Sequence, residues 1–360
     1  MTAGGTIPIP SDQWFHLKYT ARDVILYAVA VGFGGDPEYA ESDLAFVYED
    51  VSPALRVVPT WVATWPFWAT RAVPPASFAL GQLPKFPPPA MAGEVLPRHC
   101  LVDSNDATVL ADFPMLHTQQ SILWHVTSDN LPTEGSFRLR RHVVSVAPKA
   151  VGTFVTTQFD IFETASTRGG QPSSQPVVTI QLTVLILGLG SDRVRFWQTQ
   201  GTESLLPGIP PRITARPTVR QKIVVAPNQA LLYRLVSGDA NAIHVDPSTN
   251  PLQHDDDAED EADEACPPKC ILHGLATLGL VARVVLQRYP ARSWHSLQAR
   301  FRAPVFVGDT LEVDLWEAFL EEKQSCLYFC VRVVGSKTVG PWANCLFGPA
   351  ASKKSVVGVG

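Results

Sequence analysis

The chain has 360 residues, of which 46% are hydrophobic and 18% are charged, so it can bury a sizeable core and wholesale disorder is excluded. The formal net charge is -5 without a basic excess, which argues against a nucleic-acid partner. The longest apolar run, Val177–Gly190, contains Thr and Gln and is too short to span about 30 Å of hydrocarbon, so no membrane span is expected.

Capping and proline patterns mark the first boundaries along the chain. Thr20 and Asp23 have the spacing of a capping box, which predicts the start of a helix. Val73–Pro97 is rich in proline and is interpreted as a loop over the surface of the first half. Leu206–Val219 contains four prolines, which disfavour a helix or a central strand. We therefore predict two domains, 1–205 and 220–360, joined by a linker over 206–219.

The two halves contain matching segments at a constant spacing of 156 residues. Residues 115–117 (MLH) match 271–273 (ILH), and 147–152 match 303–308 in their Ala, Pro, Val and Gly. Either match alone could be chance, but both at one spacing indicate duplication of a supersecondary unit.

Each copy is predicted to begin with an apolar helix that is followed by strands. In the second copy the helix covers Ile271–Tyr289, where an apolar stripe contains small residues that allow close approach to a sheet. This stripe consists of Leu275, Gly279, Ala282 and Leu286. Alternating polarity predicts strands at 137–148, 152–163, 176–189, 296–304, 309–319, 325–335 and 342–347. A long helix against an antiparallel sheet is an α+β arrangement.

Two further patterns have both a structural and a functional interpretation. The acidic run at 255–264 is interpreted as a solvated insertion, the alternative being a docking segment. Cys266/Cys270 and Cys326/Cys330 are interpreted as buried or incidental thiols rather than zinc ligands, so no metal site is expected. Six cysteines are too few for a disulfide scaffold, and a reducing compartment is the simpler interpretation.

The segment YRLVSGDANAIHVDP, at 233–247, contains residue types that suit acid–base chemistry. Gly238 allows an unusual backbone turn, and Asp239 and His244 flank Asn241. A carboxylate and an imidazole that share one water can divide the acid and base work, with Asn241 orienting one of them or the substrate. The same residues could instead form a turn capped by Asp239, with His244 as a partly buried polar side chain.

The same segment resembles a family signature. YRLVSGDANAIH is similar to the Y-x-x-S-G-D-x-N-P-x-H signature of the MaoC-like type-2 enoyl-CoA hydratases, and Ile271–Gly279 (ILHGLATLG) is similar to their P-I-L-H-G-L-x-x-x-G block. Tyr19–Gly32 and Asp43–Asp50 resemble the hydratase unit of eukaryotic peroxisomal multifunctional enzymes. The resemblance covers nearly the whole chain in order, and the motifs are specific in combination.

This resemblance implies a double hot-dog fold, in which two antiparallel sheets each wrap a central helix. Asp239 and His244 would hold the water that adds to a trans-2-enoyl-CoA in fatty-acid β-oxidation, giving an (R)-3-hydroxyacyl-CoA, and Asn241 would support the pair. The backbone N–H of Gly274, at a helix N-terminus, would bind the thioester oxygen, where enolate-like charge develops. No cofactor is implied, because coenzyme A is part of the substrate.

Substrate contacts are implied at Gly238, His273, His117 and Gln119. The first half lacks a G-D-x-N-x-x-H run, so it would be a degenerate copy that shapes the acyl-chain pocket, with Thr118 on its helix where the second half has Gly274.

The sequence departs from the family pattern at two places. Ala242 stands where the family usually has proline. Gln119 stands where the family motif H-G-E-Q has a carboxylate, and an amide keeps hydrogen bonding but loses charge and proton exchange.

Two other functions compete with hydration. The reverse reaction would dehydrate a 3-hydroxyacyl thioester in fatty-acid synthesis, and a preference for CoA or for acyl carrier protein would separate the two. A non-catalytic acyl-CoA-binding protein, motivated by Gln119, would bind ligand without turnover. Because hot-dog sheets commonly pair across subunits, a homodimer is expected.

Members of this family act in peroxisomes, so the resemblance implies a peroxisomal location. The N-terminus lacks the pattern of a secretory signal, and the C-terminal SVVGVG is not an S-K-L address, so a mitochondrial site is the alternative.

Overall fold

The computed structural model describes residues 13–71, 87–88, 90–91, 95–103, 113–164, 174–199, 215–249, 269–290, 293–319, 325–335 and 346–348. The strands of the first half are β1 (Gln13–Tyr19), β2 (Met115–Trp124), β3 (Gly135–Lys149), β4 (Gly152–Glu163), β5 (Val178–Leu187) and β6 (Trp197–Gln198). Those of the second half are β7 (Val219–Val224), β8 (Ser296–Arg300), β9 (Thr310–Phe319), β10 (Ser325–Val333) and β11 (Leu346–Gly348). The helices are α1 (Ala21–Ala30), α2 (Ala40–Val47), α3 (Trp65–Trp68), α4 (Gln229–Ser237) and α5 (Gly274–Arg288), with short 3₁₀ turns that include η2 (Pro59–Thr64) and η7 (Ala242–His244).

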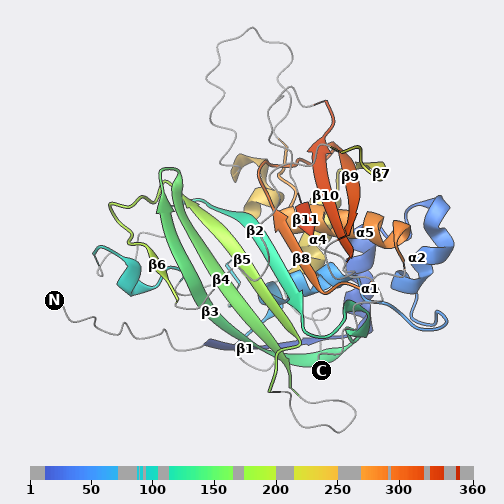
Figure 1. Cartoon of the computed structure of the whole chain (residues 1–360), viewed down its shortest axis with the longest axis horizontal. Coiled ribbons are helices and arrows are strands. Elements are labelled where there is room, and N and C mark those ends of the chain that lie inside the picture. Colours follow the sequence, from blue (N-terminus) through green and yellow to red (C-terminus); the bar gives the residue numbers. More distant parts are fainter. Residues whose placement is uncertain are drawn as a thin grey trace.

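One continuous sheet contains strands from both halves. Its order is β1-β3-β4-β5-β2-β8-β11-β10-β9-β7, with β6 paired to β3 off this path. β2 and β8 join the halves as an antiparallel pair in which Ser121 faces Gln298. Figure 1 shows the long green strands of the first half beside the orange strands of the second. Counted from its outer edge, each half has its strands in the order first, third, fourth, fifth, second, so the chain has the α+β double hot-dog fold.

The predicted alignment of the two halves, with equivalent residues 156 apart, is wrong, although the strand order supports duplication. Residues 115–117 were expected to begin a helix but belong to β2, which is hydrogen-bonded to strands on both sides, and Thr118 therefore lies on a strand. The counterpart of β2 in the strand order is β8, not the start of α5. The turn at 149–152 joins β3 to β4, which correspond to β9 and β10, so the match to 303–308 aligns segments that are not equivalent.

Among the described residues, only the second half has the long central helix that the hot-dog fold implied. α5 lies within the predicted Ile271–Tyr289, and eleven of its fifteen residues are buried. The first half instead has η2 and α3 at 59–68, and η2 packs against α5. Pro59 and Pro66 each stand at the start of one of these short helices. Because a proline inside a helix removes a hydrogen bond and clashes with the preceding turn, this segment forms two short helices and not one long helix.

A cluster of aromatic side chains fills the core of the first half. The rings of Tyr19 and Phe137 are stacked with centroids 5.6 Å apart, and Trp61 and Trp65 contact Tyr19 from the side of η2 and α3. These four side chains are at most 2% exposed, and burying each large apolar side chain contributes roughly 1.5–3 kcal/mol. The capping box is confirmed, since the Thr20 N–H donates to the Asp23 carboxylate over 2.8 Å at the start of α1.

Gly279 lets α5 approach the end of α1 rather than a sheet. A Cβ atom at Gly279 would lie 2.4 Å from Cγ1 of Val31, a buried and stiff β-branched side chain. We expect Gly279→Ala to lower the free energy of unfolding by about 1–3 kcal/mol, because overpacking outweighs the better helix propensity of alanine. Denaturant melts measure this loss, and Val31→Ala in the same chain should restore part of it. Equal or greater stability of Gly279→Ala alone would contradict this packing.

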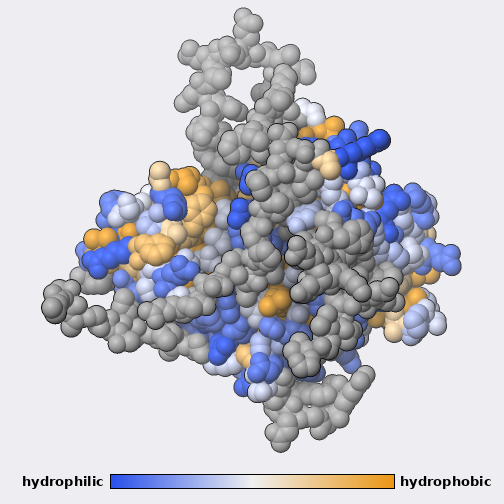
Figure 2. Space-filling model, in the orientation of Figure 1, coloured by the Kyte–Doolittle hydropathy of each residue, from blue (hydrophilic) through white to orange (hydrophobic). Residues whose placement is uncertain are grey.

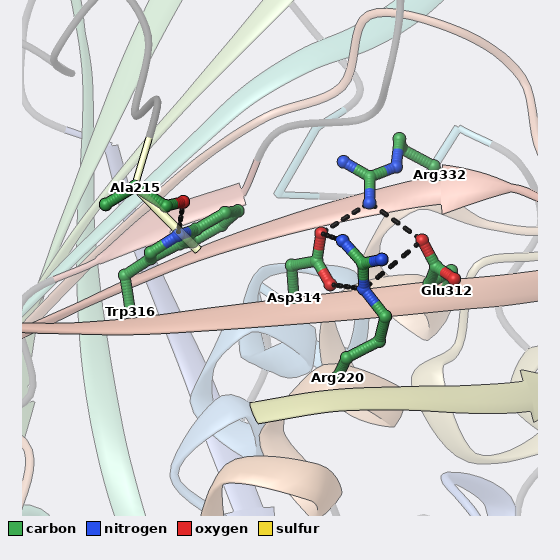
Figure 3. Close-up of polar contacts among 6 residues, drawn as sticks. All are labelled: Ala215, Arg220, Glu312, Asp314, Trp316 and Arg332. Carbon is green, nitrogen blue, oxygen red and sulfur yellow. Dashed lines mark hydrogen bonds and ion pairs between the residues drawn. The ribbon is translucent and has the colours of Figure 1, made fainter. Parts of the chain in front are cut away.

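An ion-pair cluster holds the edge strand β7 onto the sheet, on the face away from α5. Figure 3 shows Asp314 between Arg220 of β7 and Arg332 of β10, with Glu312 beside them. Arg220 Nε donates to Asp314 Oδ1 over 2.6 Å, and Arg332 also bonds this fully buried carboxylate. Burial by itself raises the pKa of Asp314, but the two guanidinium groups outweigh it and hold the pKa below its usual range. The cluster thereby fixes the strand that leads into α4.

The surface of the described residues is mixed rather than uniformly apolar. Figure 2 shows hydrophilic side chains over the α2 end and apolar patches at the opposite end, near β6 and the β3–β4 turn. The half-exposed Val151 in that turn and the more exposed Phe196 before β6 belong to this end. Among the described helices, none is long and apolar enough to cross a bilayer.

Candidate active site

A left-handed glycine ends α4 and turns the chain into the site. Gly238 has a φ of 75°, and a Cβ atom there would lie 2.9 Å from the Trp68 ring. A side chain at this position would therefore be strained and crowded. The Asp239 N–H donates to Ser237 Oγ over 3.1 Å, so the last turn of α4 fixes where the carboxylate begins.

Asn241 organises the loop between the two candidate catalytic residues. Its backbone N–H donates to Asp239 Oδ1 over 3.2 Å, and its own side-chain oxygen accepts from the Ile243 N–H over 3.4 Å at the start of η7. These are the local side-chain-to-backbone bonds that favour Asp and Asn in turns. These bonds fix the conformation of the loop that carries Asp239 and His244.

His244 presents a defined ring nitrogen to Asp239. Its Nδ1 lies 2.8 Å from the Ile271 carbonyl oxygen, which can only accept, so Nδ1 carries the proton and donates. Nε2 then has the lone pair and lies 3.9 Å from Asp239 Oδ2. This separation is too long for a direct hydrogen bond, and one water between the two atoms can bond to both.

Burial moves the two pKa values toward each other. The pKa of Asp239 is raised, mainly by burial, against the opposing effects of His244, the Asn241 N–H and Arg234. The pKa of His244 is lowered, again mainly by burial, against the effects of Asp239 and the Ile271 carbonyl. A carboxylate made more basic beside an imidazole kept neutral is suited to exchanging protons with a shared water.

The buried charge of Asp239 predicts how stability depends on pH. Since the folded-state pKa is raised, this group favours the folded state below its unfolded-state pKa, and that contribution is lost as the pH rises through the folded-state value. We therefore expect Asp239→Asn to raise Tm at neutral pH, with the advantage shrinking toward acid. Asp246→Asn is the matched control, because bonds from Ser248 lower the pKa of that exposed carboxyl. An Asp239→Asn Tm that is below the parent's at every pH would contradict the expectation.

His273 stacks on His244 and completes the buried group. The two ring centroids are 3.5 Å apart with planes inclined by 22°, and His273 Nε2 lies 3.4 Å from the Asp239 carbonyl oxygen. Burial and the neighbouring His244 hold the pKa of His273 well below its usual range. A neutral ring so placed restricts the orientation of His244.

Asp239, His244 and His273 also form a group that could hold a metal ion. Their ligand atoms lie within 4.8 Å of one another. An imidazole nitrogen binds a metal in the plane of its ring, and two nearly parallel rings 3.5 Å apart cannot both include one ion in their planes. The geometry therefore suits a shared water better than a metal.

Gly274 begins α5 beside this pair. Among the described residues none accepts a hydrogen bond from its backbone N–H, as expected in the first turn of a helix. The Phe301 ring covers its Cα side so closely that a Cβ atom would lie 3.0 Å away. The donor and the positive end of the helix dipole thus face a site where a thioester oxygen can bind.

His117 and Gln119 point to different sides of β2. The register shifts between them, so that His117 faces the interior and contacts the Phe301 ring at 5.0 Å. Burial lowers the pKa of His117 to about 4, which keeps it neutral. The Gln119 side chain instead accepts from Arg300 Nε over 3.2 Å. Thr118, expected on a helix at the place of Gly274, has its hydroxyl bonded to the Thr183 carbonyl of the neighbouring strand.

A cavity of about 360 Å³ connects the two halves. Asp239, Asn241, His244, His273, Gly274 and His117 line it, whereas Gln119 and Gly238 are not among the lining residues. Its other walls include side chains that the motif search did not single out. These are, from the first half, Phe67, Met115, Arg141, Thr157, Phe159 and Leu182. The period of two in β3, β4 and β5 could have indicated Arg141, Thr157, Phe159 and Leu182 as inward positions of strands, but it could not have indicated Phe67 in α3 or Met115 in the segment predicted as a helix.

These features define a double hot-dog protein with a mostly buried Asp–His pair beside a helix N-terminus. Residues 209–326 match the MaoC like domain family. A MaoC-like dehydratase from Phytophthora capsici has a similar fold, with a TM-score of 0.62 and 23% identity over 95% of each chain. The chain carries a MaoC-like domain, a domain of hydratase and dehydratase enzymes, within a double hot-dog fold.

Three of the curated relatives are each similar to 83% of the chain. The chain is 28% identical to Drosophila melanogaster peroxisomal multifunctional enzyme type 2, covering 41% of it. It is 29% identical to Mycobacterium tuberculosis 3-hydroxyacyl-thioester dehydratase Y, and 27% identical to the peroxisomal enoyl-CoA hydratase 2 of Arabidopsis thaliana, covering 82% of each. The chain thus spans less than half of the multifunctional enzyme but most of the other two relatives.

Proposed function

We propose that the protein hydrates trans-2-enoyl-CoA to (R)-3-hydroxyacyl-CoA. The observation that carries this proposal is the 3.9 Å separation between Asp239 Oδ2 and His244 Nε2, in a cavity that Gly274 also lines. Relatives named enoyl-CoA hydratase 2 and peroxisomal multifunctional enzyme type 2 support it.

The residues of the site can perform each part of an addition of water. Asp239 and His244 accept one proton from the shared water as its oxygen bonds to C3 of the enoyl group. The Gly274 N–H donates to the thioester oxygen, where negative charge develops while C2 becomes nucleophilic. The Asp239–His244 pair then returns one proton to C2, so the product gains one H₂O and the site is regenerated. This route requires no cofactor.

The two halves have separate tasks in this proposal. The second domain, 220–360, supplies the catalytic pair, and the first domain, 1–205, supplies the wall around the acyl chain. The sheet pairing between β2 and β8 already occurs within one chain. A homodimer remains a prediction, and sedimentation at micromolar concentration that shows only monomer would remove it. The names of the relatives also lead us to propose a peroxisomal location.

A hydration assay tests the proposal. Purified protein is mixed with trans-2-decenoyl-CoA, the loss of enoyl absorbance is followed, and the chirality of the product is resolved. We expect (R)-3-hydroxydecanoyl-CoA. Formation of the (S) product, or binding of acyl-CoA of several chain lengths without turnover, would overturn the proposal.

The alternative function is dehydration of a 3-hydroxyacyl thioester, favoured by the likeness to 3-hydroxyacyl-thioester dehydratase Y. The same assay with the acyl chain on acyl carrier protein separates the two. A much higher kcat/KM for the carrier-bound substrate would favour dehydration during synthesis. The non-catalytic acyl-CoA-binding alternative was motivated by Gln119. The Gln119 side chain bonds Arg300 and does not line the cavity, so this residue does not argue against turnover.

A further inference from the structure

Tyr233 contacts the wall of the candidate active site from outside the cavity. It lies on the inward face of α4 and is fully buried, and it is not among the residues that line the cavity. The centroid of its ring is 5.0 Å from that of His273, and the two planes are inclined by 52°. Tyr233 can therefore act on the site through His273, although it does not touch a bound substrate.

Hydrogen bonds alone hold the His273 ring weakly. Its Nε2 lies 3.4 Å from the Asp239 carbonyl oxygen, longer than the usual range of about 2.7–3.2 Å. Its buried Nδ1 has no hydrogen-bond partner in the part of the chain that the structure describes. Because His244 stacks on one face of this ring with centroids 3.5 Å apart, Tyr233 contacts the ring from another side. Packing by Tyr233 thus keeps His273 against His244.

Helix α1 fixes the position of Tyr233. The Tyr27 ring of α1 lies 6.1 Å from the Tyr233 ring, and the Tyr27 hydroxyl donates to Thr60 Oγ1 over 2.9 Å. One turn before Tyr233, the Gln229 side-chain amide donates to the Ala30 carbonyl at the end of α1. In so closely packed an interior, the histidine ring beside Tyr233 cannot turn toward α4 unless α4 moves away from α1.

We propose that Tyr233 is a positioning residue whose ring packs His273 against His244, so that the stack directs His244 Nε2 toward the shared water. This inference rests on the proposed hydration and adds a residue that acts on it through two others. Rings in contact determine each other's orientation, because one cannot turn without displacing the next. The contact requires the ring of Tyr233 and not its hydroxyl group.

The stack also predicts a pH dependence. The titratable groups beside His244 are Asp239 and His273, and Tyr233 and Arg234 of α4 interact electrostatically with Asp239. The pKa of His244 is lowered mainly by burial. Removing the Tyr233 ring leaves a space beside a polar ring that water can enter, so the pKa of His244 should return toward its usual value. His244 would then be protonated at a higher pH, and the acid side of the kcat/KM profile would move to higher pH.

Tyr233→Leu and Tyr233→Phe distinguish positioning from a structural role. We expect Tyr233→Leu to lower kcat for trans-2-decenoyl-CoA by about tenfold to a hundredfold, with a smaller effect on KM, and to move the acid side of the profile to higher pH. Tyr233→Phe keeps the ring and should keep most of the rate and the profile. Tyr19→Leu is the control, because this equally buried tyrosine contacts Phe137, Trp61 and Trp65 instead, and its loss should lower stability without moving the profile. An unmoved profile in Tyr233→Leu, or an equal loss in Tyr233→Phe, would overturn the inference.

Nitrogen NMR of the histidine rings in the free protein decides the inference without turnover. His244 should titrate at a higher pH in Tyr233→Leu than in the parent, and His244→Gln assigns its signals. If Tyr233→Leu does not fold, Tyr233→Met, which refills more of the space with a flexible chain, is measured in the same way. An unchanged titration of His244 would overturn the inference. Failure of the parent to hydrate trans-2-decenoyl-CoA would overturn the proposed function, while the titration would still decide the role of Tyr233.

Discussion

Asp239→Asn is expected to lower kcat for enoyl-CoA hydration by roughly 10²–10⁴-fold, the usual contribution of a positioned acid–base group. The amide keeps the size of the side chain and can still accept from the Asn241 N–H, but it cannot take a proton from the shared water. Initial rates with trans-2-decenoyl-CoA measure the loss, and circular dichroism shows whether the fold is retained.

His244→Gln should produce a loss of the same order. It removes the Nε2 lone pair that faces Asp239 Oδ2, while an amide N–H can still donate to the Ile271 carbonyl. Asp246→Asn changes an exposed carboxyl on the same loop and serves as the control, with an expected rate close to the parent's. Activity near the parent level in either Asp239→Asn or His244→Gln would refute the assignment of the pair.

Gly274→Ala is expected to lower kcat by about a hundredfold with a smaller effect on KM, because a small displacement of a catalytic group is enough for such a loss. The new Cβ atom would lie 3.0 Å from the Phe301 ring, which itself contacts His117. Either the ring or the first turn of α5 must move, and the backbone N–H moves with that turn. Initial rates over a range of substrate concentrations separate kcat from KM.

Phe301→Leu combined with Gly274→Ala tests the steric origin of this loss. The smaller side chain leaves room for the added methyl group, so the double variant should recover part of kcat. Phe301→Leu alone is the control for the changed cavity wall. A double variant no better than Gly274→Ala would show that the contact with Phe301 is not the cause.

The strands and the catalytic loop were predictable because their determinants are local. Period-two alternation and turn residues fixed 152–163 as β4 and most of the other strands within a few residues. Gly238, Asp239, Asn241 and His244 lie within seven residues of chain, and turns that Asp, Asn and Gly form locally bring them together.

The first half was mispredicted where tertiary pairing decides the structure. Residues 115–117 match 271–273, the segment just before α5, yet they pair with β5 and the segment becomes the start of the strand β2. Gly279 was expected to face a sheet, but which element packs on a helix depends on the fold, and here it is the end of α1.

The side on which Gln119 points could not be predicted either. A one-residue shift in the pairing of β2 with β5 sends its side chain to Arg300 and away from the cavity. The sequence pattern alone does not contain this irregularity, because it arises from pairing with strands that are distant along the chain. The replacement of the family's carboxylate by Gln119 therefore affects a contact within the sheet and does not directly affect the water site.

A double-mutant cycle of Asp239→Asn and His244→Gln tests the shared water most directly. If both side chains act on one water, removing the second adds little once the first is lost, so kcat of the double variant should be close to that of the slower single variant. Losses that multiply, so that the double variant is slower by the product of the two single effects, would show that Asp239 and His244 act independently and would contradict the shared-water site.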